Sequence, residues 1–432
     1  MDRRQFLKTA GAGAALAALS DFQTLFAKGT YDKWVGRPWK GWERGEFQVH
    51  FIYTGVGESM FMIFPDGTSM LLDCGDHDVV SRSQARGRVP LPLLPGGSRH
   101  AGEWIARYVQ RVNPGGNKVD YMMLSHYHTD HGGGRRFYSG IKPGTEDYRL
   151  SGFSEAAEYL SFGKAFDRCY PQMKEPIPLG ENVEESIQMR QFYDYQTRER
   201  GMKVEQLRLG AEDQIVMLKD PSAFGSFKIR NISANGRIAL RDGTIRDLYA
   251  DRIAKSHPKS LNENGMSQGI FIKYGPFSFY TAGDFSDSWK DENGVTHIIE
   301  EEMADAVWHA DVAKLNHHGY LNSMPRKLVK ALSARVWVSC VWDQPHTAPP
   351  TLETLSDRSL YPGDRIICPT CFTAQRRDED AGKPGVGDIC ESAFDGGHIV
   401  LNVEKGGKAY SISYLTAVDE SMKVKSVMRF IP

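Results

Sequence analysis

The chain has 432 residues, of which 41% are hydrophobic and 25% charged, a composition typical of a globular protein of one or two domains. Its 53 basic and 54 acidic residues give a formal net charge of −1. This balance excludes a protein that holds nucleic acid by overall charge. Nucleic acid remains a partner only through a local basic patch.

Residues 1–27 are predicted to be an export signal. Arg3 and Arg4 precede Phe6-Leu7-Lys8, and a small, apolar, uncharged stretch follows. That stretch is too short to span a bilayer, and the order of residues resembles a twin-arginine signal, whose route carries folded proteins. A frayed basic terminus is the alternative. No later stretch has the length and hydropathy of a transmembrane helix, so we expect a periplasmic or extracellular mature chain, unless the signal stays uncleaved as an anchor.

The predicted elements alternate between strands and helices along the chain. The last strand before the key motif, 119–125, is a nearly continuous apolar run, which indicates burial on both faces. Strands are expected over 47–53, 59–64, 69–73, 215–218, 227–232, 269–280, 312–315 and 335–341, with further strands after 397, and helices over 101–112, 184–200, 324–332 and 350–357. This mixture indicates layered α/β, with two sheets and helices outside. Part of 135–260 shows no clean period and is interpreted as an insertion over one rim.

The strongest motif follows strand 119–125 directly. His126, His128, Asp130 and His131 place three imidazoles and a carboxylate within six positions. These are the ligand types that zinc prefers where a site keeps an open position. In a tight turn, alternate residues such as His126 and His128 can point one way while Asp130 and His131 point another, which suits two metals side by side. A polar loop that is rich in histidine by chance is the less favoured interpretation.

This motif resembles the metal-binding signature of the metallo-β-lactamase superfamily, and other pieces follow in the expected order. Asp73, in Leu-Leu-Asp-Cys-Gly, is similar to the aspartate that braces the metal loop, and Asp284, in Thr-Ala-Gly-Asp, to the one that bridges both metals. Asn316-His317-His318-Gly319 is similar to the motif that supplies a histidine to the second metal, and we favour His318 because it directly precedes the glycine. The resemblance implies a four-layer αββα metallo-β-lactamase sandwich over 46–432.

Further stretches resemble one branch, the ComEC-type β-lactamase-like domain. They are 53–59, 262–267 and 310–319. The chain lacks that channel's membrane helices, and its 135–260 segment is longer than is usual in the branch. The only candidate for the superfamily's third-motif histidine is His257, which we leave out of the site because ComEC-type domains lack this ligand too.

The resemblance implies chemistry with two zinc ions, or manganese or iron in their place. The pair would share a water, lower its pKa towards 7 and so provide hydroxide, with Asp130 as a ligand and an orienter of the attacking group. His346 follows strand 335–341 in a position similar to a histidine of the ComEC-type domain. Because consecutive strands usually pair, we expect His346 near the metals, as a ligand or as a general acid, with a helix-entry hydrogen bond as the alternative.

Three functions remain open at this point. The first is a phosphodiesterase or nuclease that acts on nucleic acid or on an envelope phosphodiester. The second is a hydrolase of amides, lactones or carboxylic esters, because one fold hosts many substrates. The third, a non-catalytic metal-binding relative, is least favoured because every ligand type is present.

The six cysteines give weaker signals. Cys368 and Cys371 have the spacing of a zinc knuckle or redox pair and Cys390 follows, but no second pair matches them. A local disulfide, a structural metal site and plain thiols stay open, and plain thiols are favoured.

Overall fold

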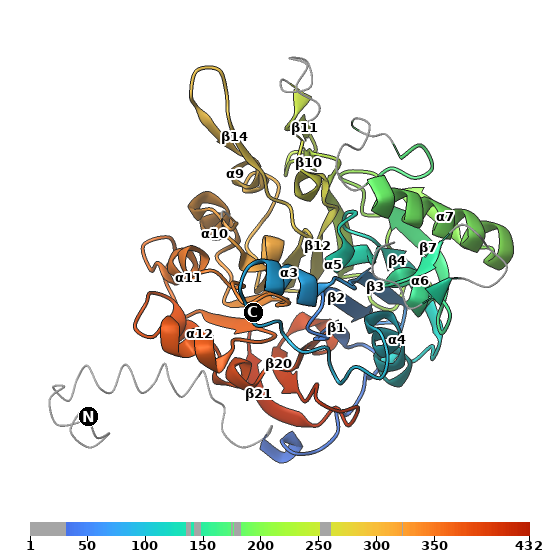
Figure 1. Cartoon of the computed structure of the whole chain (residues 1–432), viewed down its shortest axis with the longest axis horizontal. Helices are drawn as coiled ribbons and strands as arrows, with labels where there is room; N and C mark the ends of the chain where they lie inside the picture. Colours follow the sequence, from blue (N-terminus) through green and yellow to red (C-terminus); the bar gives the residue numbers. More distant parts are fainter. Residues whose placement is uncertain are drawn as a thin grey trace, which may run out of the picture.

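The computed structural model describes residues 32–134, 140–141, 148–173, 176, 183–250, 261–321 and 323–432. The signal segment 1–27 and His257 therefore lie outside the described residues. Two large mixed sheets form the centre of the molecule, and helices lie on both outer sides of the pair (Figure 1). The predicted arrangement of two sheets with helices outside is thereby confirmed.

The first sheet has nine strands and combines antiparallel with parallel pairs. In spatial order they are β21 (Val424–Phe430), β20 (Tyr410–Leu415), β19 (His398–Val403), β1 (Phe47–Phe51), β2 (Ser59–Ile63), β3 (Ser69–Cys74), β4 (Lys118–Met123), β7 (Ser161–Asp167) and β8 (Lys203–Gln206). Strand β3 pairs in parallel with β4, so their carboxyl ends share one edge. The residues that follow these two strands are therefore brought together.

The second sheet has eight strands. In spatial order they are β11 (Ile245–Asp247), β10 (Arg237–Ala239), β9 (Phe227–Ala234), β12 (Gly269–Tyr274), β13 (Phe277–Thr281), β16 (Val312–Lys314), β17 (Val336–Ser339) and β18 (Ile366–Pro369). Strands β13, β16, β17 and β18 run parallel. The expected pairing of the strand before His318 with the strand before His346 is confirmed by the register Val312↔Val336.

The core lies between the sheets and is lined by both. Met62 and Met123 of the first sheet belong to one continuous buried cluster with Ile272 and Phe279 of the second. A separate cluster joins the outer face of the first sheet to its helices, with Ile105 as one member. The helices are α3 (Val79–Ala85), α4 (Ala101–Val112), α5 (Thr129–Gly132), α6 (Phe153–Ala156), α7 (Val183–Arg200), α9 (Ile299–Met303), α10 (Arg326–Leu332), α11 (Pro349–Ser356) and α12 (Ala374–Glu379).

One expectation for 135–260 is wrong. Residues 215–218 form no strand, because their backbone groups pair with side chains of the first sheet: the Tyr121 hydroxyl donates to the Val216 carbonyl at 3.0 Å, and Leu218 N donates to Thr68 Oγ1 at 2.8 Å. The described residues of 135–260 supply β7 and β8 to the first sheet and β9 to β11 to the second. That part of this segment forms an insertion over one rim stays a prediction.

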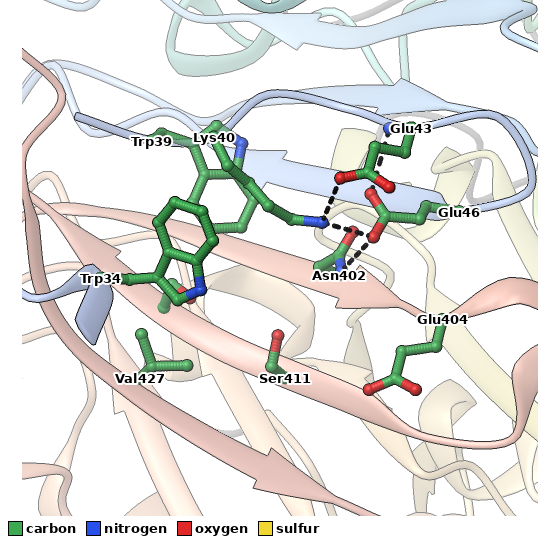
Figure 2. A pocket seen from close by; sticks show the side chains of 10 residues that line it. Trp34, Trp39, Lys40, Glu43, Glu46, Asn402, Glu404, Ser411 and Val427 are labelled. Carbon is green, nitrogen blue, oxygen red and sulfur yellow. Dashed lines mark hydrogen bonds and ion pairs between the residues drawn. The ribbon is translucent and has the colours of Figure 1, made fainter. Parts of the chain in front are cut away.

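Two smaller features complete the fold. Residues that precede β1 lie against strands β19 to β21 and enclose a cavity of about 400 Å³, in which Lys40 points towards Glu43 and Glu46 (Figure 2). This cavity shares no lining residue with the histidine motif. All six cysteines are buried thiols without a disulfide, as favoured from the sequence.

Two buried histidines outside the motif make stability dependent on pH. Burial lowers the pKa of His50 and of His398 to about 3, whereas the unfolded chain titrates near 6.5. Between these values the unfolded state binds more protons, so acid favours unfolding. We expect metal-free protein to lose about 2 kcal/mol per histidine from pH 7 to pH 5 in urea titrations.

A His398→Asn variant tests this expectation. Its side-chain oxygen can still accept the hydrogen bond that Tyr53 N donates to His398 Nδ1 at 3.0 Å, but it takes up no proton. The variant should therefore lose less stability than the parent between pH 7 and pH 5. An equal loss in the two proteins contradicts the assignment.

Candidate metal centre

The candidate ligands follow strand ends of both sheets. The loop after β4 carries His126 and His128 and runs into α5, which holds Asp130 and His131. Asp284 comes soon after β13, and His318 soon after β16 in the second sheet. Helix α5 and strand β4 lie close together near the middle of the molecule (Figure 1). The site therefore forms only when the two sheets are assembled.

Asp73, at the end of β3, holds the histidine loop. Its Oδ1 accepts a hydrogen bond from Ser125 N at 2.7 Å, and its Oδ2 lies 2.7 Å from both Ser125 Oγ and His131 Nδ1. The residue is fully buried and has a left-handed backbone, φ +60°. The structure thus places Asp73 directly behind the loop, as the sequence predicts for a bracing residue.

Three histidines direct one ring nitrogen towards Asp284. His131 Nδ1 donates to Asp73, His318 Nδ1 donates to the Cys340 carbonyl at 2.8 Å, and His126 Nδ1 faces Ser125 Oγ at 3.0 Å. These partners fix the proton on Nδ1 and leave the Nε2 lone pairs of His126 and His131 for a ligand, whereas that of His318 also accepts from Trp342 Nε1 at 3.0 Å. The Nε2 atoms of His131, His318 and His126 lie 3.2, 3.3 and 4.0 Å from Asp284 oxygens.

The potential ligand atoms form two groups that share Asp284. One contains His126, His128 and Asp284, and the other contains Glu58, His131, Asp284 and His318, each with its atoms within 4.8 Å of one another. In the first group His126 Nε2 lies 2.9 Å from His128 Nδ1. Two imidazole nitrogens at that distance need a proton or a cation between them. The donor set therefore fits two metal ions joined by one carboxylate.

Glu58 and Asp130 lie on opposite sides of His318. Glu58 Oε2 is 3.3 Å from His318 Nδ1, the nitrogen used for the Cys340 carbonyl, and 2.7 Å from Lys314 Nζ. Asp130 Oδ2 is 3.2 Å from His318 Nε2, the nitrogen that faces Asp284. Asp130 belongs to neither ligand group, so its role as a ligand stays a prediction, and Glu58 is an anion paired with Lys314.

The electrostatics of the metal-free site favour a cation. Burial acts to lower the pKa of His131 and of His318, but neighbouring carboxylates, Asp284 first, raise that of His131 well above its usual value and that of His318 to about 9. Burial likewise acts to raise the pKa of Asp284, and the histidines hold it well below its usual range. The carboxylates thus attract positive charge, which protons supply when metal is absent.

The remaining histidines of the predicted site lie close to this centre but belong to neither group. His317 faces Ser286 Oγ at 3.2 Å and Asn264 Nδ2 at 3.4 Å, which favours His318 as the ligand. The His346 ring stacks on His318 with centroids 4.8 Å apart, and Asp343 N donates to His346 Nδ1 at 3.4 Å. The expected proximity of His346 is confirmed, and its role stays a prediction.

Sequence reasoning missed the residues that support the ligands. Glu58 stood only within a stretch that resembles the ComEC-type domain, and Lys314 lay unremarked just before the Asn-His-His-Gly motif. The pair is fully buried, and Lys314 Nζ also donates to the Gly283 carbonyl at 2.7 Å. Trp342 Nε1 lies 3.0 Å from His318 Nε2. The position of Lys314 within the apolar run 312–315 was a signal that this lysine is buried, but it did not indicate its partner.

Comparison with known proteins identifies the amino terminus. A family model for the twin-arginine translocation pathway signal sequence matches residues 1–20. The chain is therefore exported by the twin-arginine pathway, as predicted. No curated protein matches the chain significantly. Within the described ranges, no helix combines the length and the hydropathy needed to cross a membrane.

Proposed function

We propose that the chain is a metal-dependent hydrolase that binds two divalent ions, zinc foremost, and cleaves phosphodiesters. The observation that carries the proposal is the pair of buried ligand groups that share Asp284. When bound, two such ions supply Lewis acidity and lower the pKa of water towards neutrality. His126, His128, His131, Asp284 and His318 would hold such ions, whose charge would favour in-line displacement at phosphorus.

Two aspartates of the chain have positioning roles. Asp73 fixes the loop, and Asp130, on the Nε2 side of His318, is placed to orient the attacking group. The motifs and the two packed sheets support a metallo-β-lactamase-like sandwich of ComEC type as the scaffold. This resemblance also favours phosphodiesters over β-lactams, and amides, lactones and carboxylic esters form the second candidate class.

A substrate comparison tests the proposal. Zinc-loaded protein is assayed with bis-p-nitrophenyl phosphate, nitrocefin and a lactone, and we expect the phosphodiester to be turned over fastest. Activity should disappear with a chelator and return with zinc. Clear nitrocefin hydrolysis without diesterase activity would overturn the ranking, and activity that survives complete metal removal would overturn the metal-dependent mechanism.

A further inference from the structure

Three arginines beside the metal centre converge on one carboxylate oxygen. Arg82 of α3, Arg86 at its end and Arg88 just beyond it place guanidinium nitrogens 3.7, 3.5 and 3.3 Å from Asp343 Oδ2. Asp343 is 3% exposed, whereas the arginine side chains are 34–40% exposed. These three residues are called the arginine cluster below. Its outer side faces solvent.

The cluster carries more positive charge than its partner neutralises. The three guanidinium groups share the Asp343 carboxylate, whose other oxygen accepts from Gln344 N at 2.8 Å, and Arg82 also feels the charge of Asp130. The distances to Asp343 exceed the 2.7–2.9 Å that is usual for charge-assisted hydrogen bonds. Arg82 Nε is buried and has no hydrogen-bond partner in the described part of the chain. The exposed parts of the Arg86 and Arg88 side chains therefore offer donors to an anion that enters from solvent.

One indole ring separates the cluster from the metal ligands. The Arg82 guanidinium lies 4.7 Å from the centre of the Trp342 ring, and Trp342 Nε1 lies 3.0 Å from His318 Nε2. The loop before α3 is also tied to the histidine loop, since Asp76 N donates to the Thr129 carbonyl at 2.9 Å. A substrate whose scissile bond lies at His318 can thus place its neighbouring group at the arginine cluster.

We propose that the arginine cluster binds a second anionic group, of phosphate type, on the substrate whose scissile bond lies at the metal centre. The proposal rests on the proposed function and names its substrate class: phosphodiesters with a further phosphate next to the bond that is cleaved. Guanidinium groups suit this task because their fork matches phosphate oxygens. The chain's net charge of −1 means that attraction for such a substrate has a local origin.

Matched dinucleotides test the proposal. Thymidine dinucleotide carries one phosphate, and its 5′-phosphorylated form carries a second. We expect zinc-loaded protein to cleave the phosphorylated form with a kcat/KM roughly tenfold higher. The double variant Arg86→Gln/Arg88→Gln should abolish this preference, while its activity on bis-p-nitrophenyl phosphate and its zinc content stay unchanged. Arg82 is left in place because it packs on Trp342.

Further variants separate recognition from a loss of structure. Arg86→Lys/Arg88→Lys keeps the charge and should retain part of the preference. Asp343→Asn removes the competing carboxylate and should increase the preference, which a merely structural ion-pair network does not predict. Arg99→Gln, at an ion pair with Glu103 on the start of α4, is the control and should change nothing. An unaltered preference in the double glutamine variant overturns the proposal.

The design also separates this inference from the proposed function. If neither dinucleotide is hydrolysed, the diesterase assignment fails, and both compounds then serve as unreacting ligands in isothermal titration. Tighter binding of the phosphorylated form to the parent, lost in Arg86→Gln/Arg88→Gln, still supports the arginine cluster as an anion site. Equal affinities for the two dinucleotides refute it.

Discussion

Replacement of Asp284 by Asn is expected to lower bound zinc from about two equivalents per chain to less than one, and diesterase kcat by roughly 10³-fold. Asp284 is the one residue that both ligand groups share, with Oδ1 towards His131 and Oδ2 towards His126 and His318. The asparagine side chain carries no negative charge, and only its oxygen is a good metal ligand. Metal analysis of protein from zinc-supplemented cells measures the loss.

Two further variants make the result specific. His128 belongs to only one group, so His128→Ala should lose about one equivalent and retain the other. Asp242→Asn changes an exposed carboxylate in the turn before β11 and should keep both equivalents. Circular dichroism verifies that each variant is folded. A folded Asp284→Asn protein with two zinc ions would contradict the shared-ligand assignment.

Replacement of His346 by Gln is expected to leave zinc content unchanged and to lower kcat by about 10²-fold. The ring is in neither ligand group, so the ligand role is not favoured. Because Nδ1 accepts from Asp343 N, Nε2 carries the hydrogen and is available as a donor to a leaving oxygen. Burial lowers the pKa of His346 well below its usual value, so the ring stays neutral. The expected decrease in kcat is therefore close to that caused by removal of one hydrogen-bond donor.

His346→Phe distinguishes donation from packing. Phenylalanine retains a ring to stack on His318 but has no donor, whereas the Gln amide can still donate, so the Phe variant should lose at least as much kcat as the Gln variant if donation matters. Full activity in the Phe variant would reduce His346 to a packing role, and loss of one zinc from the Gln variant would restore the ligand interpretation. His309→Gln alters an exposed histidine and serves as the control.

The features that could be predicted from the sequence are those that depend on residues close to one another along the chain. Strand alternation and the apolar run before Ser125 located the strands around the site, and helix 101–112 was predicted with the bounds it has. His126 to His131 are close in sequence, so their clustering needed only a turn. The pairing of β16 with β17 followed because consecutive strands usually neighbour each other.

The unpredicted part depends on contacts between residues that are distant in sequence. Glu58 and Lys314 meet across the two sheets, and the arginine cluster meets Asp343 from more than 250 positions away. No local pattern encodes such pairs. Residues 215–218 are a short apolar run that was predicted as a strand, but buried side chains of the first sheet bind their backbone groups instead, which is again a tertiary effect.

The placement of ligands on both sheets has a thermodynamic consequence. His126 and His131 come from the half of the molecule built on β4, and Asp284 and His318 from the half built on β13 and β16. Any ion held by all of them binds the native chain and not the unfolded one, so mass action adds the free energy of ligation to that of folding. We expect the zinc-free protein to open first along the seam between the sheets, which makes metal supply a determinant of its lifetime after export.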